Sequence, residues 1–594
     1  MKRYSLFLGV FLVSLGLNAL AEPGVGSNGR ALFGELHTHT SFSFDAYLFT
    51  TRATPDDAYN FAKGKPLEHA MGRTYQLTRP LDFMAVTDHG IFMGVYERMN
   101  DPEHPMSKLP IAEQARKPGE GFLAFREMID ASRSGNPIPG TDSPDVRKEA
   151  WDHIIDAANR HNDPGSFTAL IAYEWTSTPD GQNLHRNVIF KGDSAPLPFT
   201  ANESMNPEDL WAWMDGIRAK GNPVLAIPHN VNISDGRAFM RTTFDGGKLT
   251  PDYAETRNRN EPLVEVTQIK GTSEAHPELS PNDEFADFEI LELYVAQPTS
   301  VTNFVGGYVR SAYRTGLELQ DENGFNPYRF GLIGASDSHS GVSEPQENNF
   351  EGPASARSGS PEIRITGENG TQRFSNFGAS GLAGVWAEEN TRGDVFDALA
   401  RKESWATTGP RIQVRFFGGF DMDGVEPGMN NWVDAAYAKG VAMGGSLNGS
   451  NRSKAPTFTV WAIKDPEAAN LDRIQIVKGW SKNGESQENV FDVAWSGNRS
   501  VDRRTGNLSP VGNTVDLDSL EYTNSIGAVE LSATWTDPDF NPKQNAFYYV
   551  RVLEIPTPRW SAFDAKALGI DHPDHKPATI QERAYTSPIW YDHH

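Results

Sequence analysis

ALFGELHTH, residues 31–39, holds the two features on which the fold prediction depends. ALFGEL is short and apolar, as expected of a buried strand, and His37 and His39 follow it directly. Side chains at positions i and i+2 point to the same side of an extended chain, so both imidazoles can reach one metal ion. A single His-x-His pair is weak evidence of such a site, because most histidines are ordinary hydrogen-bonding residues. Its weight depends on what the other strands supply.

Five further apolar runs between residues 82 and 336 have the length of a buried strand. They are DFMAVT (82–87), FTALIAY (167–173), PVLAIP (223–228), FEILELYVA (288–296) and RFGLIGAS (329–336). Four of the five are followed directly by metal-capable side chains: Asp88 and His89, Glu174, His229, and Asp337 and His339. In α/β folds the carboxyl ends of the strands converge on one face, where active sites form. The sequence therefore predicts that these residues meet in a single metal centre, with Asp45 as a further oxygen ligand and Glu174 bridging two ions.

Helix-like segments separate the apolar runs, at residues 147–160, 206–220 and 391–402. Strands that alternate with helices predict a parallel α/β sheet or barrel. The stretches 90–147 and 230–285 are rich in Pro, Gly, Asn and Asp, and we expect them to be long loops that cover or extend the site.

The pattern changes from about residue 411. Short alternating runs, separated by turn-rich segments, predict a β-rich, sandwich-like C-terminal region. These runs are RIQVRFF (411–417), TFTVWAI (457–463), RIQIVKGW (473–480) and FYYVRVLEI (547–555).

Length and composition limit the chemistry. The chain has 594 residues, which suggests two or three domains. Its formal net charge of −24 argues against nucleic acid as a partner, since a nucleic-acid surface is basic. It has no cysteine, which excludes disulfides, thiolate ligands and cysteine nucleophiles. Metal ligands must then come from His, Asp and Glu.

The first 21 residues predict export. Lys2 and Arg3 precede a short apolar run at 5–17, and Ala19-Leu20-Ala21 is a small-x-small cleavage site. The run is shorter than the roughly 20 apolar residues of a membrane span, and no later segment is apolar enough, so no membrane insertion is expected. We expect a periplasmic or secreted protein after removal of this signal peptide.

The ligands, their order and their place at strand ends resemble the PHP superfamily, named for polymerase and histidinol phosphatase domains. The matching motifs are HTH (37–39), TDHG (87–90), Glu174, His185, His229 and SDSH (336–339). A secreted, long-chain branch catalogued as a domain of unknown function is similar in further stretches: LHRNVIF (184–190), IPHN (227–230), GLAGVWAEENTR (381–392) and ATTGPRI (406–412). The resemblance implies a distorted (β/α)7, TIM-like barrel with insertions over residues 22–412, followed by a β-rich domain over residues 413–594.

The resemblance also implies two to three divalent ions, which can be Zn, Mn or Fe, because His and carboxylate sets accept all three. His37, His39, Glu174 and Asp337 would hold the first ion; Glu174, His185 and His229 the second; Asp45, His89 and His339 the third. Asp45 departs from the family pattern, which often has His there, and His185 opens a strand-like run instead of following one.

The implied activity is that of an exported multinuclear hydrolase, a phosphoesterase that uses a metal-bridged water as nucleophile. Glu174, Asp337 and His229 would be catalytic, and Arg186 and Lys270 would bind a small anionic ester, with Arg392 and Arg411 as second candidates. Arg559 and Trp560 could project into the mouth of the barrel. Two alternatives stay open: a sulfate ester, lactone or amide hydrolase on the same metals, and a non-catalytic binding protein containing metal. The sequence predicts no oligomeric state.

Overall fold

The computed structural model describes residues 26, 29–117, 120–134, 136–141, 143–294, 299–354, 358–367, 376–449, 454–502, 504 and 506–593. The predicted signal peptide, residues 1–21, lies outside the described residues, so export stays a prediction. Among the residues that are described, no helix is both long and apolar enough to cross a bilayer.

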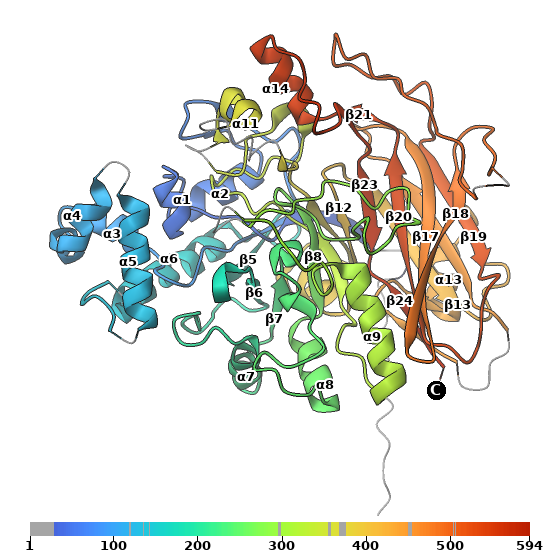
Figure 1. Ribbon diagram of the computed structural model, residues 1–594, viewed down its shortest axis with the longest axis horizontal. Coiled ribbons are helices and arrows are strands. Elements are labelled where there is room, and N and C mark those ends of the chain that lie inside the picture. The colour runs from blue at the N-terminus through green and yellow to red at the C-terminus, as the bar shows by residue number, and fades with distance from the viewer. Residues whose placement is uncertain are drawn as a thin grey trace, which may run out of the picture.

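A mixed sheet of thirteen strands runs through the molecule (Figure 1). Its order is β15-β24-β20-β23-β12-β11-β1-β4-β5-β6-β7, and β17 and β18 extend it from β20. The strands are β1 Arg30–Glu35, β4 Phe83–Val86, β5 Thr168–Trp175, β6 Arg186–Phe190, β7 Val224–Pro228, β11 Leu382–Ala387, β12 Ser404–Thr407, β15 Ser446–Asn448, β17 Leu471–Lys482, β18 Glu485–Trp495, β20 Ala546–Glu554, β23 Arg583–Thr586 and β24 Ile589–Asp592.

The strands nearest the predicted site are not all parallel. β1, β4 and β5 run parallel to one another, whereas β6 is antiparallel to both β5 and β7. A separate three-stranded sheet pairs β10 (Gly331–Gly334) in parallel with β8 (Leu263–Gln268), which also pairs with β9 (Gly271–Thr272). Beyond the end of β10, Ser338 pairs in parallel with Thr38, which brings this sheet against β1. The structure therefore has the mixed α/β class. This strand pairing does not by itself establish a distorted (β/α)7 barrel, which stays a prediction.

The helices α3–α6 lie at the opposite end of the molecule from β17, β18 and β20, as Figure 1 shows. The helices are α1 Phe44–Leu48, α2 Pro55–Ala62, α3 Val95–Asn100, α4 Pro110–Arg116, α5 Gly121–Arg133, α6 Pro144–His161, α7 Pro207–Arg218, α8 Pro251–Asn260, α9 Val309–Asn323, α11 Pro361–Thr366, α12 Arg392–Ala400, α13 Trp432–Lys439 and α14 Trp560–Leu568.

Local sequence explains where several helices begin. The side chain of Asn206 accepts the Glu208 amide at 2.9 Å, and Thr391 accepts the Asp394 amide at 3.2 Å, which satisfies donors that the first turn leaves free. The expectation of a long loop over residues 90–147 is wrong, because α3, α4, α5 and the start of α6 fill it. Pro110 and Pro144 occupy first helical positions, where proline starts a helix rather than interrupts it.

Two further sequence predictions need correction. Residues 288–294 of the predicted strand 288–296 form turns and a single bridge, because Glu289 has φ +44°, a left-handed conformation that ends an extended run. The stretch 230–285 was expected to be loop, yet it contains α8, β8 and β9. The strand that the fold needs in this part of the chain is therefore β8, about 25 residues before the one expected.

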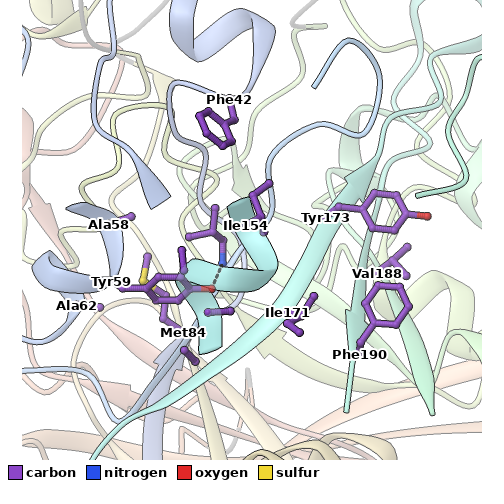
Figure 2. Packing of buried hydrophobic residues seen from close by; sticks show 14 of the residues in the cluster. Phe42, Ala58, Tyr59, Ala62, Met84, Ile154, Ile171, Tyr173, Val188 and Phe190 are labelled. Carbon is purple, nitrogen blue, oxygen red and sulfur yellow. Dashed lines mark hydrogen bonds between the residues drawn. The ribbon is translucent and has the colours of Figure 1, made fainter. Parts of the chain in front are cut away.

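The main core lies where α2 and α6 pack on β4 and β5. Figure 2 shows its packing, with Tyr59 among Ala58, Ala62 and Met84, and the rings of Tyr173 and Phe190 farther along the sheet. The Tyr59 hydroxyl donates to the Leu170 carbonyl at 3.0 Å, so this fully buried polar group is satisfied. Each large apolar side chain buried here stabilises the fold by about 1.5–3 kcal/mol. This core fixes the strands whose ends form the candidate site.

The C-terminal part is β-rich, as expected. β13 (Gln413–Gly419), β14 (Val441–Ala442), β16 (Thr457–Ile463) and β19 (Glu530–Thr536) form a four-stranded antiparallel sheet. Phe458 and Val460 of that sheet share one apolar core with Ile474 and Val550 of the central sheet. The central sheet itself crosses the predicted boundary after residue 412, since Trp405 of β12 pairs with Thr586 of β23. The separate C-terminal domain therefore stays a prediction.

Candidate metal centre

All nine predicted ligands lie together at one edge of the sheets. They come from the ends of β1 (His37, His39), β4 (His89), β5 (Glu174), β7 (His229) and β10 (Asp337, His339), from the start of β6 (His185), and from α1 (Asp45). His185 precedes its strand, but β6 is antiparallel to β5, and an antiparallel strand begins where its neighbour ends. The unusual position of His185 in the sequence thus has a topological cause.

Glu174 lies in the middle of the cluster and is buried, with five histidines around its two carboxylate oxygens. Oε1 lies 2.9 Å from Nδ1 of His185 and 3.2 Å from Nδ1 of His89. Oε2 faces the Nε2 atoms of the other three, at 3.3 Å for His37, 3.3 Å for His39 and 3.7 Å for His229. One carboxylate is therefore placed to connect two groups of imidazoles.

Asp337 and Asp45 each connect two histidines. Oδ1 of Asp337 lies 3.4 Å from Nε2 of both His37 and His39. Oδ2 of Asp45 lies 3.1 Å from Nε2 of His89 and 3.0 Å from Nε2 of His339. Asp337 has φ +57°, a left-handed conformation that non-glycine residues adopt at a cost and that is concentrated at functional sites.

In the part of the chain that the structure describes, four sets of side chains have ligand atoms close enough to hold an ion. They are His39, His89 and His339; His37, His39 and Asp337; His37, His229 and Glu265; and Glu174, His185 and His229. Glu265 was not predicted from the sequence. It lies inside β8 as a lone acid in the apolar run LVEV, and its Oε2 is 2.9 Å from Nδ1 of His37. A charged residue at a buried strand position was the signal that could have found it.

The electrostatics of these side chains follow from burial and from their neighbours. Burial opposes ionisation of Glu174, but His89, His185 and His229 outweigh it and hold its pKa well below the usual range. Burial lowers the pKa of His229 to about 4, which keeps this imidazole neutral and its ring nitrogen free to donate a lone pair. Burial raises the pKa of Glu265 to about 8, so it can be a proton donor to its neighbours near neutral pH.

Hydroxyl groups contact three of the imidazoles. Thr178 Oγ1 lies 3.0 Å from Nε2 of His185, Thr176 Oγ1 lies 2.6 Å from Nδ1 of His89, and Ser43 Oγ lies 2.9 Å from Nδ1 of His39. In metal proteins such partners fix the ring orientation and the protonation state of the ligating histidine.

The cluster opens into a pocket of about 620 Å³. His89, Glu174, His185, Asp337 and His339 face it, together with Asp45. An aromatic wall, made of Phe44, Phe49, Phe122, Phe125 and Phe377, forms part of the same lining, and Phe44 stacks on His89. The pocket therefore combines the polar cluster with aromatic surface.

Of the two predicted substrate cations, only Lys270 faces this pocket, where its Nζ contacts Oδ2 of Asp337. Arg186 does not reach the pocket: it is buried and donates through Nε to Glu261 at 2.9 Å. We therefore withdraw it as a substrate contact. Its partner Glu261 lies in a different part of the chain, which the sequence around Arg186 does not reveal.

The second-rank candidates also lie elsewhere. Arg392 donates to the Ala169 carbonyl, and Arg411 donates to the carbonyls of residues 79 and 80. Arg559 pairs with Glu289, and Trp560 packs on Phe350 in the core, so neither projects into the pocket mouth. Two further histidines lie away from the cluster: His69 is buried beside Tyr75, and His276 stacks on Phe304.

Comparisons with known proteins place the whole chain in one family. The family described as "Protein of unknown function (DUF3604)" matches residues 27–593. No curated protein matches the chain. Among solved structures, the chain is similar to a two-domain protein from Bacteroides vulgatus that is described as containing a predicted PHP-like metal-dependent phosphoesterase; the identity is 12% and the TM-score 0.30, over 86% of this chain and 96% of the other. The expectation of a branch catalogued as a domain of unknown function is confirmed, and the chain belongs to the DUF3604 family.

Proposed function

We propose that this protein is an exported phosphoesterase that depends on two to three divalent metal ions. The observation that carries the proposal is the convergence of six histidines on Glu174, Asp337 and Asp45 at the base of an open pocket. Structural metal sites are usually closed and four-coordinate, whereas this set supplies more donors than one closed site can use and opens to a cavity. Such a set is typical of catalysis.

The hydrogen bonding of the buried histidines tests whether these residues fit a metal ion. Both ring nitrogens of His229 and Nε2 of His39 are buried, and no described residue gives them a hydrogen bond. A buried polar atom without a partner costs about 1–3 kcal/mol. Imidazole nitrogens and carboxylate oxygens around such atoms are the donors that Zn, Mn and Fe accept.

His37, His39, Glu174 and Asp337 would hold the first ion; Glu174, His185 and His229 the second; Asp45, His89 and His339 the third. Ions held there would lower the pKa of water and polarise a phosphoryl oxygen. Glu174, Asp337 and His229 are in this proposal the catalytic side chains, since they surround the positions where ions and substrate meet.

The chain's own groups complete the site. Lys270 brings a positive charge to the side of Asp337 that faces the pocket, where it can pair with an anionic oxygen of the substrate. Asn230 and Gln268 donate to Oδ2 of the same carboxylate at 3.0 and 2.7 Å, which holds Asp337 in one orientation. The aromatic wall excludes water and suits an ester whose leaving group is apolar.

Activity on a matched set of 4-nitrophenyl compounds tests the proposal. We expect the metal-loaded protein to hydrolyse 4-nitrophenyl phosphate or bis(4-nitrophenyl) phosphate at least tenfold faster than 4-nitrophenyl sulfate and 4-nitrophenyl acetate. Faster turnover of the sulfate or the carboxylic ester would replace phosphoesterase by the alternative hydrolase. No turnover of any of them at full metal occupancy, measured by elemental analysis, would favour the non-catalytic alternative.

Export is tested separately from activity. We expect a reporter fused after residue 21 to appear in the periplasm or the medium, and the mature protein to begin at Glu22. A reporter that stays in the cytoplasm would refute export without affecting the proposed reaction.

A further inference from the structure

A second cavity, of about 580 Å³, has seven acidic side chains among its 23 lining residues. It lies where residues 344–348, the turn at 465–469, the end of β20 and the residue before β23 meet, and it shares no lining residue with the metal-centre pocket. We call it the acidic pocket. Two arginines, Arg79 and Arg411, face it, against seven carboxyl groups: Glu344, Glu347, Asp465, Glu467, Glu521, Glu554 and Glu582.

Glu554 is the unusual member of this lining. It is completely buried at the end of β20, and no described residue gives either carboxylate oxygen a hydrogen bond of good geometry. Burial and the charge of Asp465 keep the pKa of Glu554 well above the usual range, although Lys464 and the Ala469 amide favour its ionised form. A buried carboxylate in this condition must carry a proton or be matched by a cation from outside.

Glu347 and Glu582 form a second acidic element beside Glu554. Burial raises both pKa values, and the charge of Glu347 raises that of Glu582 further. Their hydrogen bonds to other residues come from neutral groups: Glu347 accepts from the Trp560 amide, and Glu582 accepts from the Thr408 hydroxyl. The backbone amide of Glu554 donates to the Glu582 carbonyl at 2.8 Å, which holds the two elements side by side.

The arginines of the lining are already engaged. Arg79 pairs with Asp465 and lies 3.4 Å from Glu467, and Arg411 donates to backbone carbonyls at 2.8 Å. Arg559, which faces Glu347, binds both carboxylate oxygens of Glu289. The charged and titratable groups that face Glu347, Glu554 and Glu582 are thus Glu289, Lys464, Asp465, Tyr522 and Arg559. Within the described residues, Arg79 and Arg559 form their ion pairs with other carboxylates, and no ion pair holds Glu347, Glu554 or Glu582.

The shape of the pocket favours an organic cation over a metal ion. Among the described residues, no three ligand side chains of this lining come as close together as those of the metal centre do. Leu77, Leu520, Tyr522 and Phe563 share the lining with the carboxyls. Apolar and aromatic surface between separated carboxylates suits an alkyl chain and its ammonium groups, including attraction of the cation to the Tyr522 ring.

We propose that the acidic pocket binds a small aliphatic diamine, whose ammonium groups pair with Glu554 and with the Glu347–Glu582 pair and whose alkyl chain packs on the apolar lining. The site would be separate from the metal centre and independent of the proposed phosphoesterase activity. Binding converts carboxyl groups into carboxylates, so it releases protons, and affinity rises with pH until those groups are ionised in the free protein.

Isothermal titration calorimetry of the full mature protein with 1,3-diaminopropane, 1,4-diaminobutane and 1,5-diaminopentane tests the proposal. At least one diamine is expected to bind, with tenfold or greater preference over n-butylamine and over Ca²⁺, and with three- to tenfold higher affinity at pH 8 than at pH 6. Titrations in two buffers of different ionisation heat should reveal proton release. Preference for Ca²⁺, affinity independent of pH, or no binding by any diamine at millimolar concentration would overturn it.

Variants assign the binding to these carboxyls. Glu554→Gln and Glu582→Gln are each expected to weaken diamine binding at least tenfold. Glu467→Gln is the matched control, since Glu467 is half exposed at the pocket edge and its effect should stay below threefold. Diamine binding that is unchanged in both Glu554→Gln and Glu582→Gln would refute the assignment.

A second measurement keeps the test independent of ligand choice. A carboxyl with a raised pKa destabilises the folded state as pH rises through that pKa. The melting temperature of the wild type should therefore fall more between pH 6 and pH 8.5 than that of Glu554→Gln, and added diamine should restore it in the wild type alone. Equal pH dependence in the two proteins would contradict an ionisable, unmatched Glu554.

Discussion

Two buried clusters of carboxylates differ in what neutralises them. In the first, which we call the ionic cluster, Glu274 and Asp283 are faced by Arg310 and Arg551. Arg551 lies 2.6 Å from Asp283 and 3.2 Å from Glu274, and Arg310 lies 2.8 Å from Asp283 and contacts Glu274 as well. Each carboxylate therefore has two guanidinium partners within the chain.

The metal centre has a similar degree of burial but a different set of partners. Glu174 is faced by imidazoles, which are neutral unless they take up a proton, and some of their ring nitrogens have no partner among the described residues. A pair of arginines neutralises a buried carboxylate permanently, because the guanidinium group does not lose its proton. A set of histidines can instead exchange protons for metal ions. The comparison separates a cluster that serves stability from one that is built to receive a ligand.

Loss of the central carboxylate should break the metal centre most severely. We expect Glu174→Gln to lower kcat/KM for the preferred phosphoester by about 10³-fold or more, because an amide cannot supply negative charge to two groups of ligands. Steady-state kinetics and elemental analysis measure the effect. Glu403→Gln, at another buried glutamate away from the pocket, is the control and should keep full activity in the folded protein. Wild-type turnover in Glu174→Gln would remove the basis of the proposed function.

Loss of one arginine should break the ionic cluster, with the opposite signature. Arg551→Met leaves Glu274 and Asp283 with one cation between them, which we expect to lower the free energy of unfolding by about 3–5 kcal/mol. Urea unfolding measures this, and kcat of the folded fraction should not change. Arg241→Met is the control: its exposed pairs with Glu318 and Glu322 should contribute less than about 1 kcal/mol. A large loss of kcat at unchanged stability would show that the two clusters are not separate.

Mild acid should distinguish the two clusters in one protein. Burial opposes ionisation of Asp283, but Arg551 and Arg310 outweigh it and lower its pKa, so its contribution is complete above the unfolded value of about 4 and is lost only as pH falls through the lower folded value. Metal ligation needs neutral imidazoles, so each ligand that must shed a proton costs up to about tenfold in metal affinity per pH unit.

Between pH 7 and pH 5 we therefore expect metal and activity to be lost while the fold persists. Dialysis at pH 5 followed by elemental analysis and circular dichroism measures both quantities, and return to pH 7 with metal should restore activity. Unfolding that accompanies metal loss at pH 5 would mean that the ionic cluster does not hold the fold by itself.

The smallest effect should come from the groups that orient the ligands. Thr178→Val removes the hydroxyl that contacts Nε2 of His185 and keeps the shape of the side chain. We expect metal affinity to fall by about 10–100-fold, with little change in the free energy of unfolding. Competition with a fluorescent chelator measures affinity. The more conservative Thr178→Ser should restore it, and failure of that rescue would indicate a packing effect instead.

The ligands could be predicted from the sequence because each depends on a local pattern. A short apolar run gives the strand, and the residue after it gives the ligand, as for His89, Glu174 and His229. β4, β5, β7 and β10 begin and end within about two residues of the predicted runs. The ligand types and their order then agree with a known superfamily, which was enough to add His185.

What could not be predicted depends on contacts between distant segments. Glu265 lies on a strand within a stretch that was expected to be loop. Arg186 forms an ion pair with Glu261, which belongs to the segment after α8. The run at 288–296 alternates like a strand, yet Arg559 near the C-terminus binds Glu289 and holds it in a turn. The continuity of the sheet from β12 to β23 is also set by such long-range pairing.

The pairing of β1 with β11 affects when the site can form during synthesis. Leu32 pairs with Val385, so the residues that hold His37 and His39 in place are made long after those histidines. At a synthesis rate of about 5–20 residues per second, the delay is roughly 20–70 s. Such non-local pairing is slow to fold, and the unfinished sheet leaves β1 without one of its neighbours. The first ligands to be made are thus among the last to be fixed, and a metal ion offered to the growing chain meets only part of its site.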